Sequence, residues 1–279
     1  MYCFFAHHRS ASSSTNDILR ELSRHFGWRH LTVHNPEMHG NDLSAFCRLS
    51  RHDLLTFSNA RRDYLKDLPD FRGVHLIRDP RDVLISSYYS HRESHSLKQW
   101  PELAAHRQEL RSVDEEQGLL LEMDCRAEQF GHLGAWQYND PRILEWRMEE
   151  LVTDPGHHFQ QLLAFWGLDI TPTDRLSTHL RPRANQLLSG VERRLDGPLL
   201  PRWNTNSIGT DALYAVVEQH SFDNKTDGRS PGQLDSSHHY RIGTQGSWRP
   251  HFTERVSAHF KQRFGMLLIQ LGYEEGMEW

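Results

Sequence analysis

Arg78 and Ser86 are the two residues whose types and spacing indicate chemistry most directly. Arg78 follows an apolar run, Val74–Ile77, that is typical of a buried strand. Asp79 and Pro80 come next and favour the start of a helix, on which Ser86 lies eight residues after Arg78. A guanidinium forms charge-assisted bidentate hydrogen bonds with phosphate oxygens, and a serine hydroxyl adds a neutral donor. Because ligands collect at the carboxyl edge of open α/β sheets, this pair predicts a phosphate site there.

A loop near the N-terminus is the second candidate phosphate site. Residues 2–6 (YCFFA) predict a short buried strand. The polar run 7–16 that follows is rich in serine, and Thr15, Asn16 and Asp17 favour a helix N-terminus. Backbone N–H groups at the start of a helix can bind an anion. The loop lacks the Gly-Lys pair of a Walker A motif, and a serine-rich turn is by itself equally consistent with an ordinary loop.

The segment from Arg78 to Tyr88 resembles the 3′-phosphate-binding motif of sulfotransferases that use 3′-phosphoadenosine 5′-phosphosulfate (PAPS). The resemblance implies that Arg78 and Ser86 bind the 3′-phosphate of PAPS. Asp82 is expected to return a capping-box hydrogen bond to the start of the helix. The residues that carry the resemblance are Arg78-Asp79-Pro80-Arg81-Asp82-Val83, followed by Ser86 and Tyr88.

The N-terminal loop takes the place of the 5′-phosphosulfate loop of that family. Arg9 stands where the family usually has lysine, and by this resemblance it neutralises the leaving 5′-phosphate during transfer. Ala11 and Ser14 replace a glycine and a tryptophan, so one adenine-stacking ring is missing. The loop residues that the resemblance implies in cofactor binding are Arg9, Ser10, Ala11, Ser12, Ser13 and Ser14.

Two later segments complete the resemblance, which covers residues 2 to about 273. The segment 240–248 resembles the third signature of the family, in which Arg241, Ile242 and Gly243 would contact the 3′-phosphate. Ile242 stands where the family usually has a lysine. The segment 220–222 resembles the adenine-binding element, so Ser221 and Phe222 are expected to contact the adenine.

The general base that accepts the proton of the acceptor is not evident from the family pattern. Many sulfotransferases have a histidine at the end of the strand that corresponds to residues 53–58, and this chain has Ser58 there. His91 lies five residues after Ser86, on the helix that leaves the predicted cofactor site, and it is the favoured catalytic histidine. A glutamate base, Glu115 or Glu116, is equally consistent with the chemistry.

The elements that position these residues alternate between strands and helices. This alternation predicts an α/β fold, a doubly wound parallel sheet flanked by helices in a single domain, 1–279. The segments 93–135 and 172–215 match no motif and are expected to shape the acceptor site. Long loops are expected to dominate 172–240, and the C-terminal helix is expected to pack on the sheet. The strand-sized apolar runs are 2–6, 31–34, 53–58, 74–77 and 143–146.

Composition argues against several classes of protein. A net charge of -5 disfavours nucleic-acid binding. No apolar run approaches the roughly 20 residues of a membrane-spanning helix, and the N-terminus has no secretion signal, so a cytoplasmic protein without a membrane span is expected. The 20 histidines and 3 cysteines lack the spacing of a metal site, and the family resemblance implies no metal.

These observations predict a sulfotransferase that moves a sulfuryl group from PAPS to a hydroxyl or amine of a small-molecule or carbohydrate acceptor. A P-loop-type kinase shares the strand–loop–helix phosphate site, but it needs a Gly-Lys-Ser/Thr loop and a carboxylate that binds Mg²⁺. A nucleotide-binding protein with impaired catalysis is the other alternative, because the strand-end histidine is missing. Neither the acceptor nor the oligomeric state is indicated by the sequence.

Overall fold

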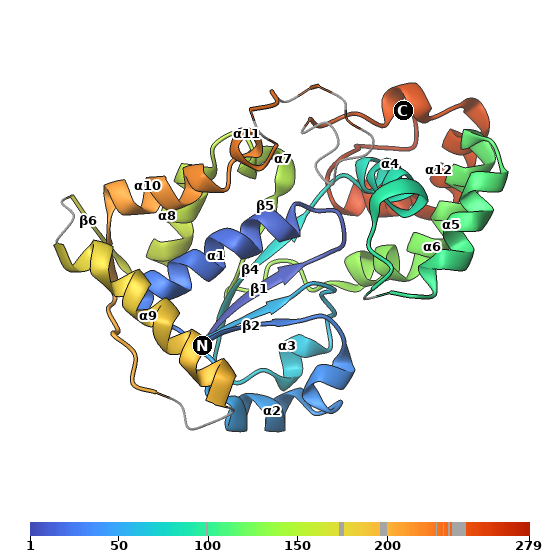
Figure 1. Cartoon of the computed structure of the whole chain (residues 1–279). Helices are drawn as coiled ribbons and strands as arrows, with labels where there is room; N and C mark the ends of the chain where they lie inside the picture. Colours follow the sequence, from blue (N-terminus) through green and yellow to red (C-terminus); the bar gives the residue numbers. More distant parts are fainter. Residues whose placement is uncertain are drawn as a thin grey trace.

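A five-stranded parallel sheet forms the centre of the computed structural model (Figure 1). The structure describes residues 1–98, 100–172, 176–195, 200–226, 228–230, 232–233, 235 and 244–279. The prediction of an α/β fold with a parallel sheet is confirmed. The strands are β1 (Tyr2–Ala6), β2 (His30–Val33), β3 (Leu54–Phe57), β4 (Arg72–Ile77) and β5 (Ile143–Arg147), and a separate parallel pair joins β6 (Asp169–Thr171) to β7 (Ser207–Gly209).

Helices surround the sheet, and within the described residues none of them is both long and apolar enough to cross a membrane. The α-helices are α1 (Ser12–Phe26), α2 (Leu43–Ser50), α3 (Tyr64–Asp67), α4 (Pro80–Tyr89), α5 (Leu103–Ser112), α6 (Glu115–Ala135), α7 (Met148–Leu151), α8 (Pro155–Phe165), α9 (Leu176–Leu195), α10 (Thr210–Gln219), α11 (Phe222–Lys225) and α12 (Glu254–Gln270). The shorter turns are the 3₁₀ segments η1 (Pro36–His39) and η3 (Arg249–His251) and the π-helical turn η2 (Ser90–Ser94).

Strand β1 is apolar throughout because its side chains point alternately into two cores. Phe4 packs with Leu22 of α1 on one face of the sheet. Phe5 packs on the other face, with its ring centroid 5.3 Å from that of Phe57 and 5.2 Å from that of Trp136. A strand that is buried on both faces reads as a continuous apolar run, and helices must then cover both faces.

The order of the strands, β2-β3-β1-β4-β5, determines where a ligand can bind. From β1 the chain passes to the edge strand β2, returns to β3 beside β1, and then crosses to β4 on the other side of β1. This reversal of strand order leaves a crevice at the carboxyl edge, next to β1. The loop after β1 and the loop after β4 therefore lie side by side at that edge.

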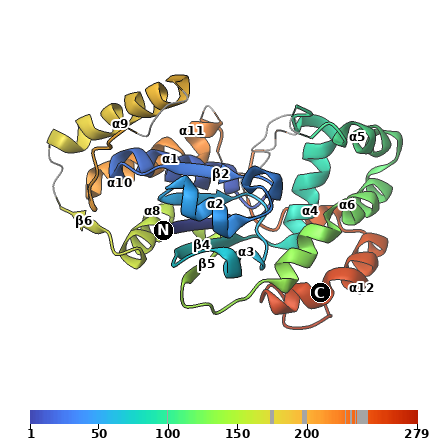
Figure 2. The same cartoon turned by 90° about the horizontal axis from the view of Figure 1, so that it is seen from below.

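The segment 172–240 is more helical than its sequence predicts, and the prediction of long loops is wrong for α9 and α10. Pro182 lies inside α9, where it removes one helical hydrogen bond. Tertiary contacts hold the helix nonetheless: the Asn185 side chain donates to the Arg24 carbonyl (2.9 Å), and Arg181 donates to the His25 carbonyl (3.4 Å). These contacts lie at the C-terminal end of α1, and Figure 2 shows α9 and α10 on the opposite side of the molecule from α5, α6 and α12.

The C-terminal helix α12 packs mainly against α6 rather than on the sheet, which corrects the expectation from sequence. The ring of Phe264 lies 4.8 Å from that of Phe130 on α6, in an edge-to-face arrangement. Phe260 and Leu268 are buried in the same core, together with Tyr88 of α4. The apolar face of α12 thus covers α6 and α4, and these three helices form a separate core beside the sheet.

Candidate active site

The loop between β1 and α1 presents an uncapped helix N-terminus. Helix α1 begins at Ser12, three residues before the predicted cap at Thr15, and its N-cap residue is Ala11. Ala11 has a φ of 59° and Arg9 a φ of 69°, a left-handed conformation that is uncommon for residues other than glycine. No side chain of the described residues caps the helix, so its first backbone N–H groups face the loop. Such a loop can bind an anion through its backbone.

Arg9, Arg78 and Ser86 meet at this loop, as the sheet order requires. The Nε of Arg9 donates to Oγ of Ser86 at 2.9 Å, and Nη1 of Arg78 donates to the carbonyl oxygen of Arg9 at 3.0 Å. Arg78 follows β4 directly, and Ser86 lies in the middle of α4. Arg78 and Ser86 are each 8% exposed, and both line the cavity at this edge. Two guanidinium groups and one hydroxyl therefore border the N-terminus of α1.

The start of α4 is confirmed as predicted, but the role expected of Asp82 is wrong. Asp79 caps the helix by accepting from the backbone N–H of Arg81, whereas its own N–H donates to Glu149 rather than to Asp82. The Asp82 carboxylate instead accepts from the backbone N–H groups of Gly246 (2.7 Å) and Trp248 (3.0 Å). The buried carboxylate thus anchors the end of the third signature segment to α4.

A cavity of about 1180 Å³ opens at this edge of the sheet. The segment 220–222 reaches it from α10, and the hydroxyl of Ser14 donates to the His220 carbonyl at 2.8 Å. Ser10 is buried beneath the loop, where its hydroxyl donates to the His7 carbonyl at 2.7 Å. The predicted cofactor residues that line the cavity are Arg9, Ala11, Ser12, Ser13, Ser14, Arg78, Ser86, Ser221 and Phe222. The predicted contacts Arg241, Ile242 and Gly243 lie outside the described residues.

The cavity continues from the phosphate end toward two further walls. One wall comes from the ends of β2 and β3, and the other comes from the segment 93–135, which was predicted to shape the acceptor site. None of the described residues of 172–215 lines the cavity. The lining therefore gives no support to the prediction that this segment shapes the acceptor site. The residues of the first wall include His34, Met38, Ser58 and Tyr64, and those of the second include His95, Trp100, Cys125, Arg126 and Gln129.

His34 is a site residue that the sequence analysis missed. Its Nδ1 lies 2.9 Å from Oγ of Ser58, the residue at the position of the missing strand-end histidine. β2 pairs with β3 in parallel, with Val33 opposite Phe57, so the residues that follow these strands must be neighbours. The strand pattern contained this signal, because Leu31–His34 and Asp53–Ser58 were both predicted as strands. An imidazole therefore lies at this end of the cavity, supplied by the adjacent strand.

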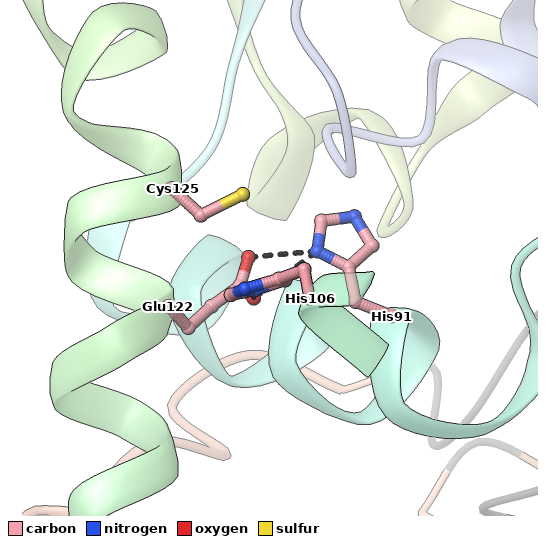
Figure 3. Close-up of side chains that lie close together, drawn as sticks. All are labelled: His91, His106, Glu122 and Cys125. Atoms are coloured by element: carbon pink, nitrogen blue, oxygen red, sulfur yellow. Dashed lines mark hydrogen bonds and ion pairs between the residues drawn. The ribbon is translucent and has the colours of Figure 1, made fainter. Parts of the chain in front are cut away.

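His91 is completely buried and does not line the cavity. Its Nδ1 lies 3.1 Å from Oε2 of Glu122, and its Nε2 lies 3.3 Å from Nε2 of His8. His8 does line the cavity, and burial together with the nearby Arg126 lowers the pKa of His8 well below its usual range. His91 is therefore separated from the cavity by lining residues such as His8, and its assignment as catalytic base stays a prediction. Figure 3 shows His91 facing Glu122, with His106 and Cys125 beside them.

The two alternative glutamate bases are engaged elsewhere. Glu115 accepts from the Tyr89 hydroxyl at 2.9 Å and pairs with His251. Glu116 accepts from Thr253 and pairs with Arg255 at 3.2 Å. Neither glutamate lines the cavity. These two carboxylates tie the start of α6 to the start of α12, which is a structural role.

Comparison with known proteins identifies a domain family and a fold that this chain resembles. A model of the sulfotransferase domain family matches residues 65–193, which include β4, the Arg78 motif and α6. Mouse sulfotransferase SULT7A1, complexed with PAP, superposes with a TM-score of 0.55 at 14% identity, over 96% of this chain and 83% of that chain. A retinol dehydratase in complex with androsterone and inactive cofactor PAP superposes with a TM-score of 0.52 at 14% identity, over 96% of this chain and 80% of that chain.

No curated protein sequence matches the chain. The resemblance to the sulfotransferase family that the motifs indicated is nonetheless confirmed by the domain match, and the fold is confirmed by the solved structures. The domain model begins to match at residue 65, after the N-terminal loop, so it says nothing about Arg9 and Ser12–Ser14.

Proposed function

We propose that this chain transfers a sulfuryl group from PAPS to a hydroxyl of a small-molecule acceptor. The support is the match of the sulfotransferase domain model to residues 65–193 and the fold that the chain shares with solved sulfotransferase structures. The observation that carries the proposal is the meeting of Arg9, Arg78 and Ser86 at the uncapped N-terminus of α1, on one cavity. Two guanidinium groups and a set of backbone donors suit a ligand with two separate phosphate groups. PAP, the ligand in both superposed structures, is such a ligand.

We assign the cofactor contacts from the position of each group. Arg78 and Ser86 bind the 3′-phosphate, with Arg241 and the backbone of 242–243 as further predicted donors. Ser14 fixes the adenine-side segment 220–222 through its hydrogen bond to the His220 carbonyl, and Phe222 offers a ring that lines the cavity. The cavity is large enough for a nucleotide and a small acceptor together.

Transfer requires that the charge on the leaving 5′-phosphate be neutralised as the sulfur–oxygen bond breaks. Arg9 and the N–H groups of Ser12 and Ser13 stand at the loop where that phosphate would lie, and the backbone N–H groups are already fixed in place. Nε of Arg9 now donates to Ser86, so a contact of the phosphate with Nε requires that the guanidinium turn toward the ligand. Arg9 thus links the two phosphate subsites.

We assign the general base to His34 rather than to His91. Oγ of Ser58 lies 3.4 Å from the Val33 carbonyl and donates to it, so it can accept from Nδ1–H of His34. This arrangement leaves Nε2 of His34 unprotonated and able to take a proton from the acceptor hydroxyl. His34 lines the cavity directly, whereas His91 is buried behind residues that line it, among them His8.

The acceptor is proposed to be a small molecule because both walls beyond the phosphate end offer apolar surface from Met38, Tyr64 and Trp100. The retinol dehydratase structure contains androsterone, a small molecule of that kind. A cytoplasmic location, an amine acceptor and a carbohydrate acceptor stay predictions from sequence.

Calorimetric titration with PAP tests the proposal. Arg78→Ala should lower PAP affinity by about 10- to 100-fold, since a hydrogen bond to a charged group contributes about 1.5–3 kcal/mol. Arg62→Ala, which removes an exposed arginine outside the cavity, should leave the affinity unchanged. Tighter binding of ATP with Mg²⁺ than of PAP would instead favour the kinase alternative. A turnover assay with PAPS and a panel of phenols and sterols completes the test. If the protein binds PAP but releases no PAP from PAPS with any of these acceptors, the alternative of a nucleotide-binding protein with impaired catalysis is favoured.

A further inference from the structure

Four side chains that can each bind a metal ion converge beside the cavity. They are His91 of η2, His106 of α5, and Glu122 and Cys125 of α6, and Figure 3 shows them pointing toward one another. One ligand atom from each lies within 4.8 Å of every other. Nδ1 of His91 is 2.9 Å from Oε1 of Glu122, and Nε2 of His106 is 2.9 Å from Oε2. Three elements thus contribute to one small volume.

Burial makes this convergence costly unless the groups are well satisfied. His91 and Glu122 have no exposed side-chain surface, and His106 is 17% exposed. Oε1 of Glu122 has no hydrogen-bond partner among the described residues, although His91 and Arg126 lie close to it. A buried carboxylate oxygen without a hydrogen bond is a group that an unoccupied ligand position would explain.

We propose that His91, His106, Glu122 and Cys125 bind one divalent zinc-type ion. Two imidazoles, one carboxylate and one thiolate form the kind of ligand set that Zn²⁺ accepts in tetrahedral sites. Zinc–ligand bonds of about 2.0–2.3 Å place neighbouring ligand atoms roughly 3.3–3.8 Å apart, so the closest pairs must open by about half an ångström. The spacing of Glu122 and Cys125, three residues apart on α6, puts both on one face of that helix.

The surroundings of the cluster match the outer contacts of a metal site. Nη2 of Arg126 donates to Sγ of Cys125 at 3.2 Å, and its Nε lies 3.2 Å from Oε1 of Glu122. These contacts orient both anionic ligands and offset their charge. With the ion on Nδ1, the Nε2–H of His91 can donate to Nε2 of His8, 3.3 Å away. Ligating histidines usually donate their second N–H to an acceptor, most often a carboxylate, a backbone carbonyl or water, and here His8 would take that place.

A second group, His8, His91 and His95, shares one of these histidines. It offers no anionic ligand, whereas the first group supplies a thiolate and a carboxylate whose charges balance a divalent ion. We therefore assign the ion to the first group. The zinc would join η2, α5 and α6 beside the cavity wall to which Cys125, Trp100 and His95 belong. It would be structural, and sulfuryl transfer would not proceed through it.

The test uses the purified full chain after removal of bound metal by chelation. Titration with Co²⁺ should produce a thiolate-to-cobalt charge-transfer band and the visible bands of a tetrahedral site, and one equivalent of Zn²⁺ should abolish them. Cys125→Ser should remove the charge-transfer band, and His106→Gln should weaken zinc binding at least tenfold. The matched controls, Cys47→Ser on α2 and the exposed His259→Gln on α12, should behave as wild type.

Alkylation of the wild-type protein gives an answer that is independent of how the variants fold. Mass-spectrometric mapping of iodoacetamide modification should show Cys125 alkylated at least tenfold more slowly with Zn²⁺ than without it. The alternative is that the four groups, with Arg126, satisfy one another without an ion. A cobalt spectrum without a thiolate band, a band that persists in Cys125→Ser, or equal alkylation with and without Zn²⁺ would each establish that alternative and overturn the proposal.

Discussion

The Nε of Arg9 donates a hydrogen bond to Oγ of Ser86 across 2.9 Å, and so the loop after β1 contacts the helix after β4. The two residues are far apart in sequence, and each belongs to a different predicted phosphate subsite. Through this contact, the guanidinium of Arg9 from the predicted 5′-phosphate subsite reaches into the predicted 3′-phosphate subsite when no cofactor is bound. Binding of either phosphate should therefore affect the other end.

Arg9→Ala should slow the transfer step more than it weakens cofactor binding. Removing one donor that stabilises a developing anion costs about 10²- to 10³-fold in kcat. Arg9→Lys keeps the charge but loses the planar fork and the bond to Ser86, so a fall of about tenfold or less is expected. Single-turnover rates at saturating PAPS measure this, with PAP affinity as the control. Weaker PAP binding with an unchanged single-turnover rate at saturating PAPS for Arg9→Ala would instead assign Arg9 to ground-state binding alone.

His34→Ala should remove general-base catalysis and leave PAP binding intact. General bases typically contribute about 10²- to 10⁴-fold, so a loss of at least 10² in kcat is expected. Ser58→Ala should have a smaller effect, because it only frees the imidazole to rotate. The measurement is the pH–rate profile, whose acidic limb should disappear in His34→Ala. If the acidic limb were unchanged in His34→Ala and absent in His8→Ala, the general base would be the His8–His91 pair instead.

Two glycines of α6 should respond to the same substitution in opposite directions. A Cβ on Gly118 would lie 2.6 Å from Cε2 of the buried Tyr88, so Gly118→Ala must shift α4 or α6 and should destabilise the fold by about 1–3 kcal/mol. A Cβ on Gly131 would meet nothing within 4 Å, so Gly131→Ala should stabilise by roughly 0.5–1 kcal/mol. Urea unfolding of the two variants measures both effects. A stabilised Gly118→Ala would show that the α4–α6 contact is looser than the structure indicates.

The pair of His75 and Glu145 should make the fold less stable as pH rises above 6.5. His75 is fully buried. Its Nδ1 lies 2.6 Å from Oε2 of Glu145, and its Nε2 lies 2.9 Å from Nε2 of His7. Burial lowers the pKa of His75 to about 3, and burial raises the pKa of Glu145 to about 8 against a hydrogen bond from Trp136. The folded pair therefore keeps one proton, on Glu145, up to about pH 8.

The unfolded chain behaves differently, because its glutamate loses its proton near pH 4.5 and its histidine near pH 6.5. Between pH 6.5 and 8 the folded state holds one more proton than the unfolded state, so the free energy of unfolding falls as pH rises. The slope should be smaller than the about 1.4 kcal/mol per pH unit of a fully buried group, since the Glu145 side chain is 28% exposed. Urea unfolding at pH 6.5 and 8 measures it. Glu145→Gln should remove most of the fall in the free energy of unfolding between pH 6.5 and 8. A fall of the same size in that variant would assign the effect to another group.

The sequence alone determined the elements whose signals are local. The apolar run before Arg78 became β4, and Asp79 caps the helix that follows, because burial on two faces and capping depend on residues close in the chain. The same local signals placed Arg9 after a strand and Ser86 on a helix. Parallel strands that end at one edge then bring these residues together. The family motif from Arg78 to Tyr88 is likewise a continuous run of residues, so its identification depends on no tertiary contact.

The tertiary structure alone decided the contacts between distant segments. Asp82 was expected to complete a local capping box, yet the backbone of Gly246 and Trp248 offered its carboxylate better-placed donors. His91 was expected at the cavity, but its ring is buried against Glu122, 31 residues later in the chain. His34 came to Ser58 through the pairing of β2 with β3. Sequence patterns record the periodicity of each element, whereas which side chains meet depends on how the elements pack.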